Sequence, residues 1–344
     1  MPLAKERYSD DNTPRYIPGV PHVESYFLKA NHPDNPRAIW LKATILGRSD
    51  AESSLAEAWC CLFDGIHHNN WGGKHTLPIS QSSFSGKPLC VNIEPCHFHF
   101  DTNKGSASGK VENEYGQATW DLHWQEEEQP PLAAPLSIFP MRQLVDGPFP
   151  RSKLLTPAPA LRFNGHVIWN NEKFEIDNWY GMQGHNWGKE HANTYAWAQT
   201  LFLDDSGELF CMAEGFSGRI RIAGLQTPWI SALVVRHRER ELRFDRLLNL
   251  WRQHINIGDL NWTLHIGSPD GEALLSMQTR PEDVVCLGYR NPNEKLSYCI
   301  NSKLASTTLR VNPTHGESFE CFSQHGGALE FLRSTPPANK MQVV

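Results

Sequence analysis

The stretch AIWLKATIL–GRSDAESS–LAEAWCCLFD, residues 38–64, contains two short apolar runs on either side of a cluster of turn residues. Runs rich in aromatic and β-branched residues, separated by such a cluster, are typical of an antiparallel hairpin. Similar runs recur about every 8–14 residues along most of the chain, which is the spacing of an antiparallel sandwich or barrel. The first half has no amphipathic helix pattern longer than about ten residues. The sequence therefore predicts an all-β protein.

The same pattern returns in the second half of the chain. Trp40 heads the first apolar run, and Trp197 heads a matching run that is followed by Asp-Asp-Ser-Gly and by the run 209–215. Each copy has a tryptophan-led strand, a turn, and a second strand that ends near an acidic residue and a glycine. We interpret this as a duplication of one β domain.

Eight prolines lie between Pro130 and Pro159, which predicts an extended segment that crosses between the domains. Its apolar side chains must be buried, so we expect it to pack along the domain interface. We predict an N-terminal arm at residues 1–20, a first barrel at 21–129, a crossing segment at 130–160 and a second barrel at 161–344.

Composition excludes several classes of protein. The 344 residues carry a formal net charge of −6, which gives no electrostatic footprint for nucleic acid. There is no apolar run of the ~18–20 residues that a membrane helix needs, and the first residues lack the apolar region of a secretory signal. The eight cysteines form no CxxC pair, which favours free thiols in the cytoplasm. The 12 tryptophans require extensive burial.

The segment from Trp179 to His191, WYGMQGHNWGKEH, combines three glycines with aromatic and polar side chains. Three glycines disfavour a helix and permit close backbone approach, so we predict a bulge or a loop beside a barrel. In one interpretation Trp187 plugs a barrel end while His185 and Asn186 satisfy loop backbone groups. In the other interpretation these residues form the polar end of a ligand pocket.

Glu214 is a carboxylic acid in an apolar strand. It shares a face with apolar residues, so burial is expected to raise its pKa, as a general acid requires. The neighbouring strand places Tyr195, Trp197 and Gln199 on one face, which would complete a polar wall. The alternative is a core carboxylate paired with Arg219 or Arg221.

Two further charged stretches are interpreted more simply. Asp64 ends a strand before Gly65, which favours a role in the turn, although its face also makes it a binding candidate. Charges alternate along residues 236–243, which is typical of a solvated hairpin.

A metal site is not expected. His97 and His99 alternate on one strand and could chelate zinc, but no third ligand has a suitable spacing. The spacing of His185 and His191 matches no helical zinc motif. Dinucleotide-binding, P-loop and nucleophile-elbow motifs are also absent from the sequence.

The chain resembles the lipocalin-like superfamily of carotenoid hydratases (hydroxyneurosporene synthases), with tocopherol cyclases and fungal Diels–Alderase-type cyclases as more distant members. The resemblance rests on residues 24–31 followed by 38–42, on PRSK at 150–153, and on GHNWG at 184–188 with His191 and the 195–197 run. It implies two consecutive calycin-type barrels, a site near their junction, and often no metal or organic cofactor.

We therefore expect a cofactor-independent hydratase or cyclase, a lyase or isomerase, acting on a hydrophobic, unsaturated or prenylated small molecule. Aromatic faces would favour a developing carbocation. The expected catalytic residues are Glu214, His185, Asn186 and Tyr195. The expected substrate-binding residues are Trp179, Trp187, His191, Trp197, Gln199 and Asp64.

Two alternatives stay open: a non-catalytic carrier of an apolar metabolite, and a structural protein whose barrels are filled. Contact with a membrane surface is a further open possibility, and the sequence does not define the oligomeric state.

Overall fold

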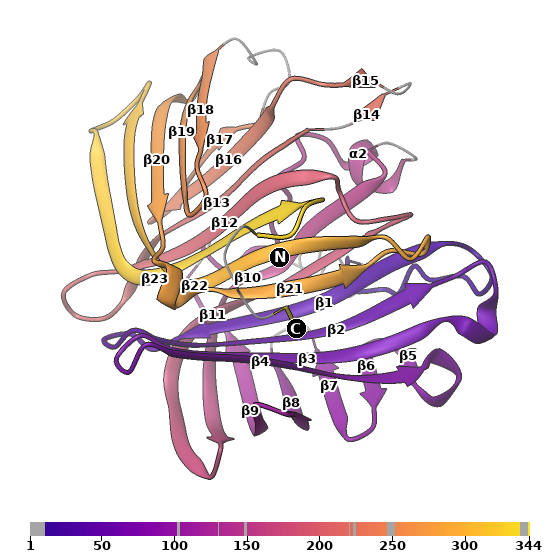
Figure 1. The fold of residues 1–344 in the computed structure, drawn as a ribbon. Helices are drawn as coiled ribbons and strands as arrows, with labels where there is room; N and C mark the ends of the chain where they lie inside the picture. Colours follow the sequence, from indigo (N-terminus) through magenta and orange to yellow (C-terminus); the bar gives the residue numbers. More distant parts are fainter. Residues whose placement is uncertain are drawn as a thin grey trace.

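The computed structural model describes residues 11–101, 104–129, 131–147, 150–219, 221–222, 225–245, 252–337 and 343–344. Within these ranges the chain consists almost entirely of antiparallel strands, which confirms the all-β prediction. Figure 1 shows two large curved sheets packed against each other, with the indigo strands of the N-terminal part beneath the orange strands from later in the chain. These two sheets are the two predicted lipocalin-like units.

The first sheet has 11 strands and curls back on itself. In spatial order they are β4 (Asn69–Pro78), β3 (Leu55–Asp64), β2 (Arg37–Gly47), β1 (His22–Asn31), β11 (Glu172–Gly188), β10 (Ser152–Trp169), β9 (Gly116–Glu126), β8 (Lys104–Asn113), β7 (Cys96–Phe100), β6 (Leu89–Ile93) and β5 (Ser83–Ser85). Asn113 at the end of β8 accepts a hydrogen bond from the Trp71 indole of β4 at 3.0 Å, so β4 and β8 approach across the barrel.

The second sheet has 10 strands. In spatial order they are β17 (Arg240–Phe244), β16 (Ile230–His237), β13 (Leu209–Arg219), β12 (Thr194–Leu203), β23 (Phe319–Arg333), β22 (Leu296–Pro313), β20 (Gly271–Gln278), β19 (Asn261–Ser268) and β18 (Gln253–Ile257), while β21 (Val285–Arg290) pairs with β22 outside this order. A separate ribbon joins β14 (Arg221–Ile222) to β15 (Leu225–Gln226).

The described helices are short. They are η1 (Ala51–Ser53), η2 (Ile79–Gln81), α2 (Arg142–Asp146) and η4 (Pro281–Asp283). Among the described residues, no helix has the length and apolar character that crossing a membrane requires.

We expected the second domain to begin at residue 161. The chain passes from the first sheet to the second only after β11. Strands β10 and β11 pair with β9 and β1 in the first sheet, and the second sheet starts with β12. Both quoted segments of the repeat form antiparallel hairpins, β2–β3 and β12–β13. Of the predicted N-terminal arm, residues 1–10 lie outside the described part.

Strands β1, β2 and β3 are buried on both faces. In β2, Ile39 and Leu41 point into the core of the first sheet, whereas Trp40 points into a cluster shared with the second sheet. By contrast, β9 alternates buried and exposed residues, because only one of its faces is covered. The central strands therefore form a common wall between two packed regions.

Most of the glycine-rich segment lies in strand β11 and not in a loop, and an irregular register occurs in its pairing with β10, where Leu155, Ala158 and Leu161 pair with His185, Gln183 and Gly181. Residues 180–188 of β11 pair with β1 in unbroken register. A Cβ atom at Gly184 would lie 2.1 Å from the Phe27 ring, and one at Gly181 would lie 1.9 Å from the Lys29 carbonyl oxygen. Gly184 therefore leaves room for the Phe27 ring, and Gly181 leaves room for the backbone of Lys29.

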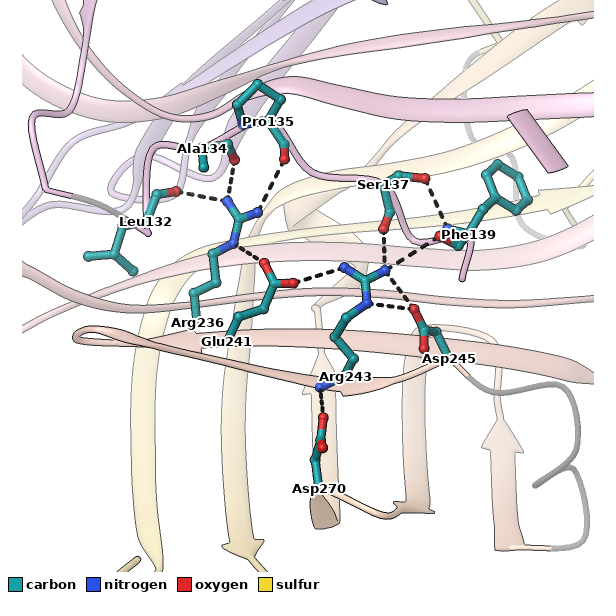
Figure 2. A network of polar contacts seen from close by, with 10 residues as sticks. All are labelled: Leu132, Ala134, Pro135, Ser137, Phe139, Arg236, Glu241, Arg243, Asp245 and Asp270. Carbon is teal, nitrogen blue, oxygen red and sulfur yellow. Dashed lines mark hydrogen bonds and ion pairs between the residues drawn. The ribbon is translucent and has the colours of Figure 1, made fainter. Parts of the chain in front are cut away.

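The proline-rich segment packs between the sheets, and two arginines of the second sheet bind its backbone. Figure 2 shows the Arg236 guanidinium reaching the carbonyl oxygens of Leu132, Ala134 and Pro135. Glu241 accepts hydrogen bonds from Arg236 at 2.8 Å and from Arg243 at 3.0 Å.

The prediction of a solvated hairpin at residues 236–243 is therefore wrong at Arg236, which is buried. The alternation of charges in the sequence could not show that the proline-rich crossing segment covers the face of the hairpin that carries Arg236. Arg243 also donates to the Ser137 carbonyl oxygen at 2.7 Å, so both arginines fix the segment in place.

Arg236→Met should destabilise the protein by about 3 kcal/mol, because three carbonyl oxygens and Glu241 lose a buried donor. Urea unfolding would measure the loss, and limited proteolysis would report release of residues 131–147. Arg238→Met, at an exposed position of the same hairpin, is the control and should change stability by less than about 0.5 kcal/mol. Equal unfolding midpoints for the two variants would contradict this account.

Candidate functional site

A cavity of about 1060 Å³ opens between the two sheets. Its wall combines aromatic and charged side chains from both sheets. Those that carry the argument below are Trp40, Lys42, His191, Tyr195, Trp197, Tyr289 and Glu330. This volume is at the upper end of the range for small-molecule sites, which often lie between domains.

The two tryptophans that head the repeated strands both lie at this junction. Trp40 of β2 and Trp197 of β12 both contact the cavity, and the Lys303 ammonium lies 5.5 Å and 5.9 Å from their ring centroids. Lys303 is fully buried and donates to Glu330 at 2.8 Å and to Asn301 at 2.6 Å. Asn301 also donates to Glu330 at 3.1 Å, so this carboxylate is firmly positioned.

Tyr195 brings a phenol to the same carboxylate. Burial, together with the negative charge of Glu330 and hydrogen bonds to Cys299 and Glu330, raises the pKa of Tyr195 well above its usual value. The hydroxyl therefore keeps its proton at neutral pH, and it can take part in hydrogen bonding at the cavity wall.

Lys42 and His191 form the other half of the polar wall. Burial lowers the pKa of Lys42 to about 8, and its Nζ lies 3.8 Å from the centroid of the Tyr289 ring. Burial and the nearby charge of Lys42 lower the pKa of His191 to about 3, so this imidazole is neutral. His191 stacks on Tyr289 with ring centroids 5.0 Å apart.

Glu214 lies behind the cavity wall and does not line it. Its carboxyl group accepts hydrogen bonds from the Trp197 indole at 3.1 Å and from the Thr156 hydroxyl at 2.7 Å. Burial raises its pKa to about 7, against the effect of these hydrogen bonds. The alternative partner Arg219 instead stacks on Trp229, and the side chain of Arg221 lies outside the described part. Glu214 is thus placed to orient Trp197.

His185 belongs to a different buried network. Its Nε2 lies 2.9 Å from the Glu24 carboxylate, which also contacts His22 at 3.0 Å and accepts a hydrogen bond from the Tyr26 hydroxyl at 2.9 Å. Burial alone would raise the pKa of Glu24, but the hydrogen bonds from both histidines and their charges lower it to about 2. The Arg15 backbone also donates to this carboxylate at 2.9 Å, so the network fixes the N-terminal arm.

Five further residues that the sequence predicted for the site do lie at the cavity. Asn186, Trp187, His191, Tyr195 and Trp197 line the cavity.

The other predicted residues lie elsewhere. Trp179 packs in the first core, next to a space of only about 30 Å³. Gln199 is buried opposite Glu214 and donates to the Pro159 carbonyl oxygen at 3.1 Å. Asp64 accepts hydrogen bonds from Arg37 and contacts His67, as expected of a turn residue.

No metal cluster is present among the described residues, in the sense of three or more suitably placed His, Cys, Asp or Glu side chains. His97 and His99 lie on the outward face of β7, and His97 contacts Asn92 at 3.0 Å.

Sequence reasoning missed Lys42, Lys303, Tyr289 and Glu330. The sequence did offer a signal for Lys42, Lys303 and Glu330, because each is a charged residue within an apolar strand, as Glu214 is. Only the packing of the two sheets against each other brings these residues together.

Comparison with known proteins places this geometry in a wider group. No protein-family model matches the chain. The uncharacterized protein Rv0493c of Mycobacterium tuberculosis is 26% identical over 318 residues, which cover 89% of this chain and 88% of that protein. A solved structure described as a putative AttH of Nitrosomonas europaea has a TM-score of 0.56 at 11% identity, covering 91% of this chain and 92% of that one.

Two further solved structures are similar. CghA with bound Sch210972 has a TM-score of 0.58 at 9% identity, over 91% of this chain and 88% of that one. Kievitone hydratase of Nectria haematococca has a TM-score of 0.54 at 12% identity, over 92% and 91%. The chain shares their lipocalin-like fold. At these identities the likeness concerns the fold.

The raised pKa of Glu214 predicts how stability depends on pH. The folded state holds a proton that the unfolded chain releases near pH 4.5, so this stabilising effect is complete below pH 4.5 and is lost as pH rises to about 7. The full loss is about 3 kcal/mol. Glu214→Gln should remove this part of the dependence in urea unfolding between pH 5 and 8.

Glu317→Gln, at an exposed position, is the matched control and should keep the wild-type profile. An unchanged pH profile in Glu214→Gln would show that this carboxyl is not the group responsible.

Proposed function

We propose that the chain is a cofactor-independent hydratase or cyclase and that the cavity between the sheets is its active site. The observation that carries the proposal is the convergence of Tyr195, Glu330 and Lys42 on a cavity whose wall also carries aromatic rings, including those of Trp40, Trp197 and Tyr289. A filled structural protein needs no such space, and a carrier of an apolar metabolite needs no such set of ionisable groups.

The groups present suit proton transfer to an apolar substrate. Lys42 has a pKa near the working pH, which suits a proton donor or acceptor. The aromatic rings of Trp40 and Trp197 would hold an unsaturated or prenylated skeleton. Hydration adds one water across a double bond and cyclisation only rearranges bonds, so neither reaction requires net oxidation or reduction.

The fold comparison is consistent with this proposal. One structure of the same fold is named as a hydratase, and another was solved with the small molecule Sch210972 bound. We also propose a cytoplasmic location, which the eight free cysteines support, and a hydrophobic small molecule rather than nucleic acid as the binding partner.

Incubation of the protein with a cell lipid extract, followed by mass spectrometry, tests the proposal. A hydratase produces a species heavier by one water, whereas a cyclase produces an isomer of unchanged mass. Recovery of an unaltered bound compound would instead favour the carrier, and absence of both binding and turnover would refute a ligand site.

Tyr195→Phe should reduce turnover about 100-fold or more, because it removes the hydroxyl at Glu330 and keeps the ring. Thermal stability should change little by comparison. Tyr115→Phe makes the same change at an exposed position and should keep full activity. Equal activity of the two variants would exclude a catalytic role for Tyr195.

A further inference from the structure

Lys42 presents a buried positive charge to the cavity. Its side chain is almost fully buried, and its Nζ lies over the Tyr289 ring at 3.8 Å and beside the Trp40 ring at 5.7 Å. Among the residues that the structure describes, none accepts a hydrogen bond from this Nζ. An ammonium group has three donors, so its acceptor must come from water or from a ligand in the cavity.

The two carboxylates that act most on Lys42 each contact another lysine. The charged and titratable groups around it are Glu57 of β3, Tyr289 of β21, Cys299 and Lys303 of β22, Glu330 of β23, and His191. Both carboxylates already have partners. Glu330 accepts the Lys303 ammonium at 2.8 Å, and Glu57 lies 3.8 Å from the Lys74 ammonium.

A second lysine, Lys29, does not line the cavity. Lys29 is also buried at the sheet junction, where it donates to the carbonyl oxygens of Gln199 and Gly326. Burial and the charge of Lys303 lower its pKa well below the usual value. His191 adds a neutral ring beside Lys42, so it can offer a hydrogen bond without adding charge.

We infer that the ligand of this cavity carries an oxygen that is anionic, or becomes anionic during the reaction, and that the Lys42 ammonium holds it. The reacting double bond would then be conjugated to a carbonyl group. As a statement about the reaction, the inference rests on the proposed function. As a statement about binding, it stands on the geometry of the cavity alone.

The electron balance of such a hydration explains the role of Lys42. The oxygen of water bonds to the β-carbon, and the π pair of the double bond shifts to the bond between the α-carbon and the carbonyl carbon. The π pair of the C=O bond moves to its oxygen, and an enolate forms. The enolate oxygen then returns its electron pair, so that the C=O bond forms again and the α-carbon bonds to a proton. The added water loses one proton, so the net change is one water across the double bond. The ammonium stabilises the enolate oxygen, where charge develops.

A carbocation route is disfavoured at the same place. Protonation of an isolated double bond would create a positive charge near the ammonium groups of Lys42 and Lys303, which repel it. The structure thus argues against the expectation, based on aromatic content, that the rings serve a carbocation.

Binding of three probes with the same chain tests the inference: dodecanoate, dodecanol and dodecylammonium, below the concentrations at which they aggregate. Quenching of tryptophan fluorescence would report binding, because Trp40 and Trp197 line the cavity. At pH 7 dodecanoate should bind at least about 10-fold more tightly than dodecanol, as a charge-assisted hydrogen bond predicts, and dodecylammonium should bind most weakly.

Lys42→Met should reduce the affinity for dodecanoate to that for dodecanol and leave dodecanol binding unchanged. Methionine keeps a similar length and removes a buried charge, so the fold should tolerate it. In the wild type, the preference for dodecanoate should fade as pH rises from 7 to 9, because Lys42 loses its proton near pH 8. Lys110→Met, at a surface ion pair on β8, is the matched control. It has the same net charge as Lys42→Met and should keep the preference for dodecanoate.

Three results would overturn the inference: equal or tighter binding of dodecylammonium, a preference for dodecanoate that survives in Lys42→Met, or no binding of any probe. The proposed function fails separately. A protein that binds dodecanoate through Lys42 but converts nothing in the lipid extract would refute the hydratase or cyclase and retain the anion site.

Discussion

The structure depends on the burial of strands β1, β2 and β3 on both faces. One face packs in the core of the first sheet and the other meets the second sheet, so neither can be solvated. Such a wall must satisfy its polar groups within the protein. Lys29 does so by donating to backbone carbonyl oxygens of the second sheet, and Asn31 donates to the Lys303 carbonyl oxygen at 2.6 Å. These side chains join two sheets between which the described residues form no strand pairing.

Much of the strand order along the chain could be predicted from the sequence. The two apolar runs within residues 38–64 form β2 and β3, and the run 209–215 lies in β13, because these runs of apolar and β-branched residues end at turn residues. The glycines of β11 misled the prediction. A glycine in a strand marks close backbone approach as well as a bulge, and only the Phe27 ring against Gly184 shows which applies.

The site was harder to predict than the strands, for a reason that strand geometry makes plain. His185 and Asn186 are neighbours on β11 and therefore point to opposite faces. Asn186 reaches the cavity, whereas His185 stacks on Tyr26 with ring centroids 4.3 Å apart. The alternation of side chains was readable in the sequence. Which face the second sheet covers was not, because that depends on contacts between residues more than a hundred positions apart.

The abundance of tryptophan has two separate explanations in the fold. Trp120, Trp124 and Trp179 fill the first core, and Trp262 fills the second, so both sheets are packed with their own side chains.

Trp40 and Trp197 instead lie where the two curved sheets meet, and there the packing leaves a large cavity. Close packing is easiest within one sheet that curls on itself, whereas two independently curved surfaces match less well. The position of the large cavity between the sheets, rather than inside either one, follows from that difference in packing.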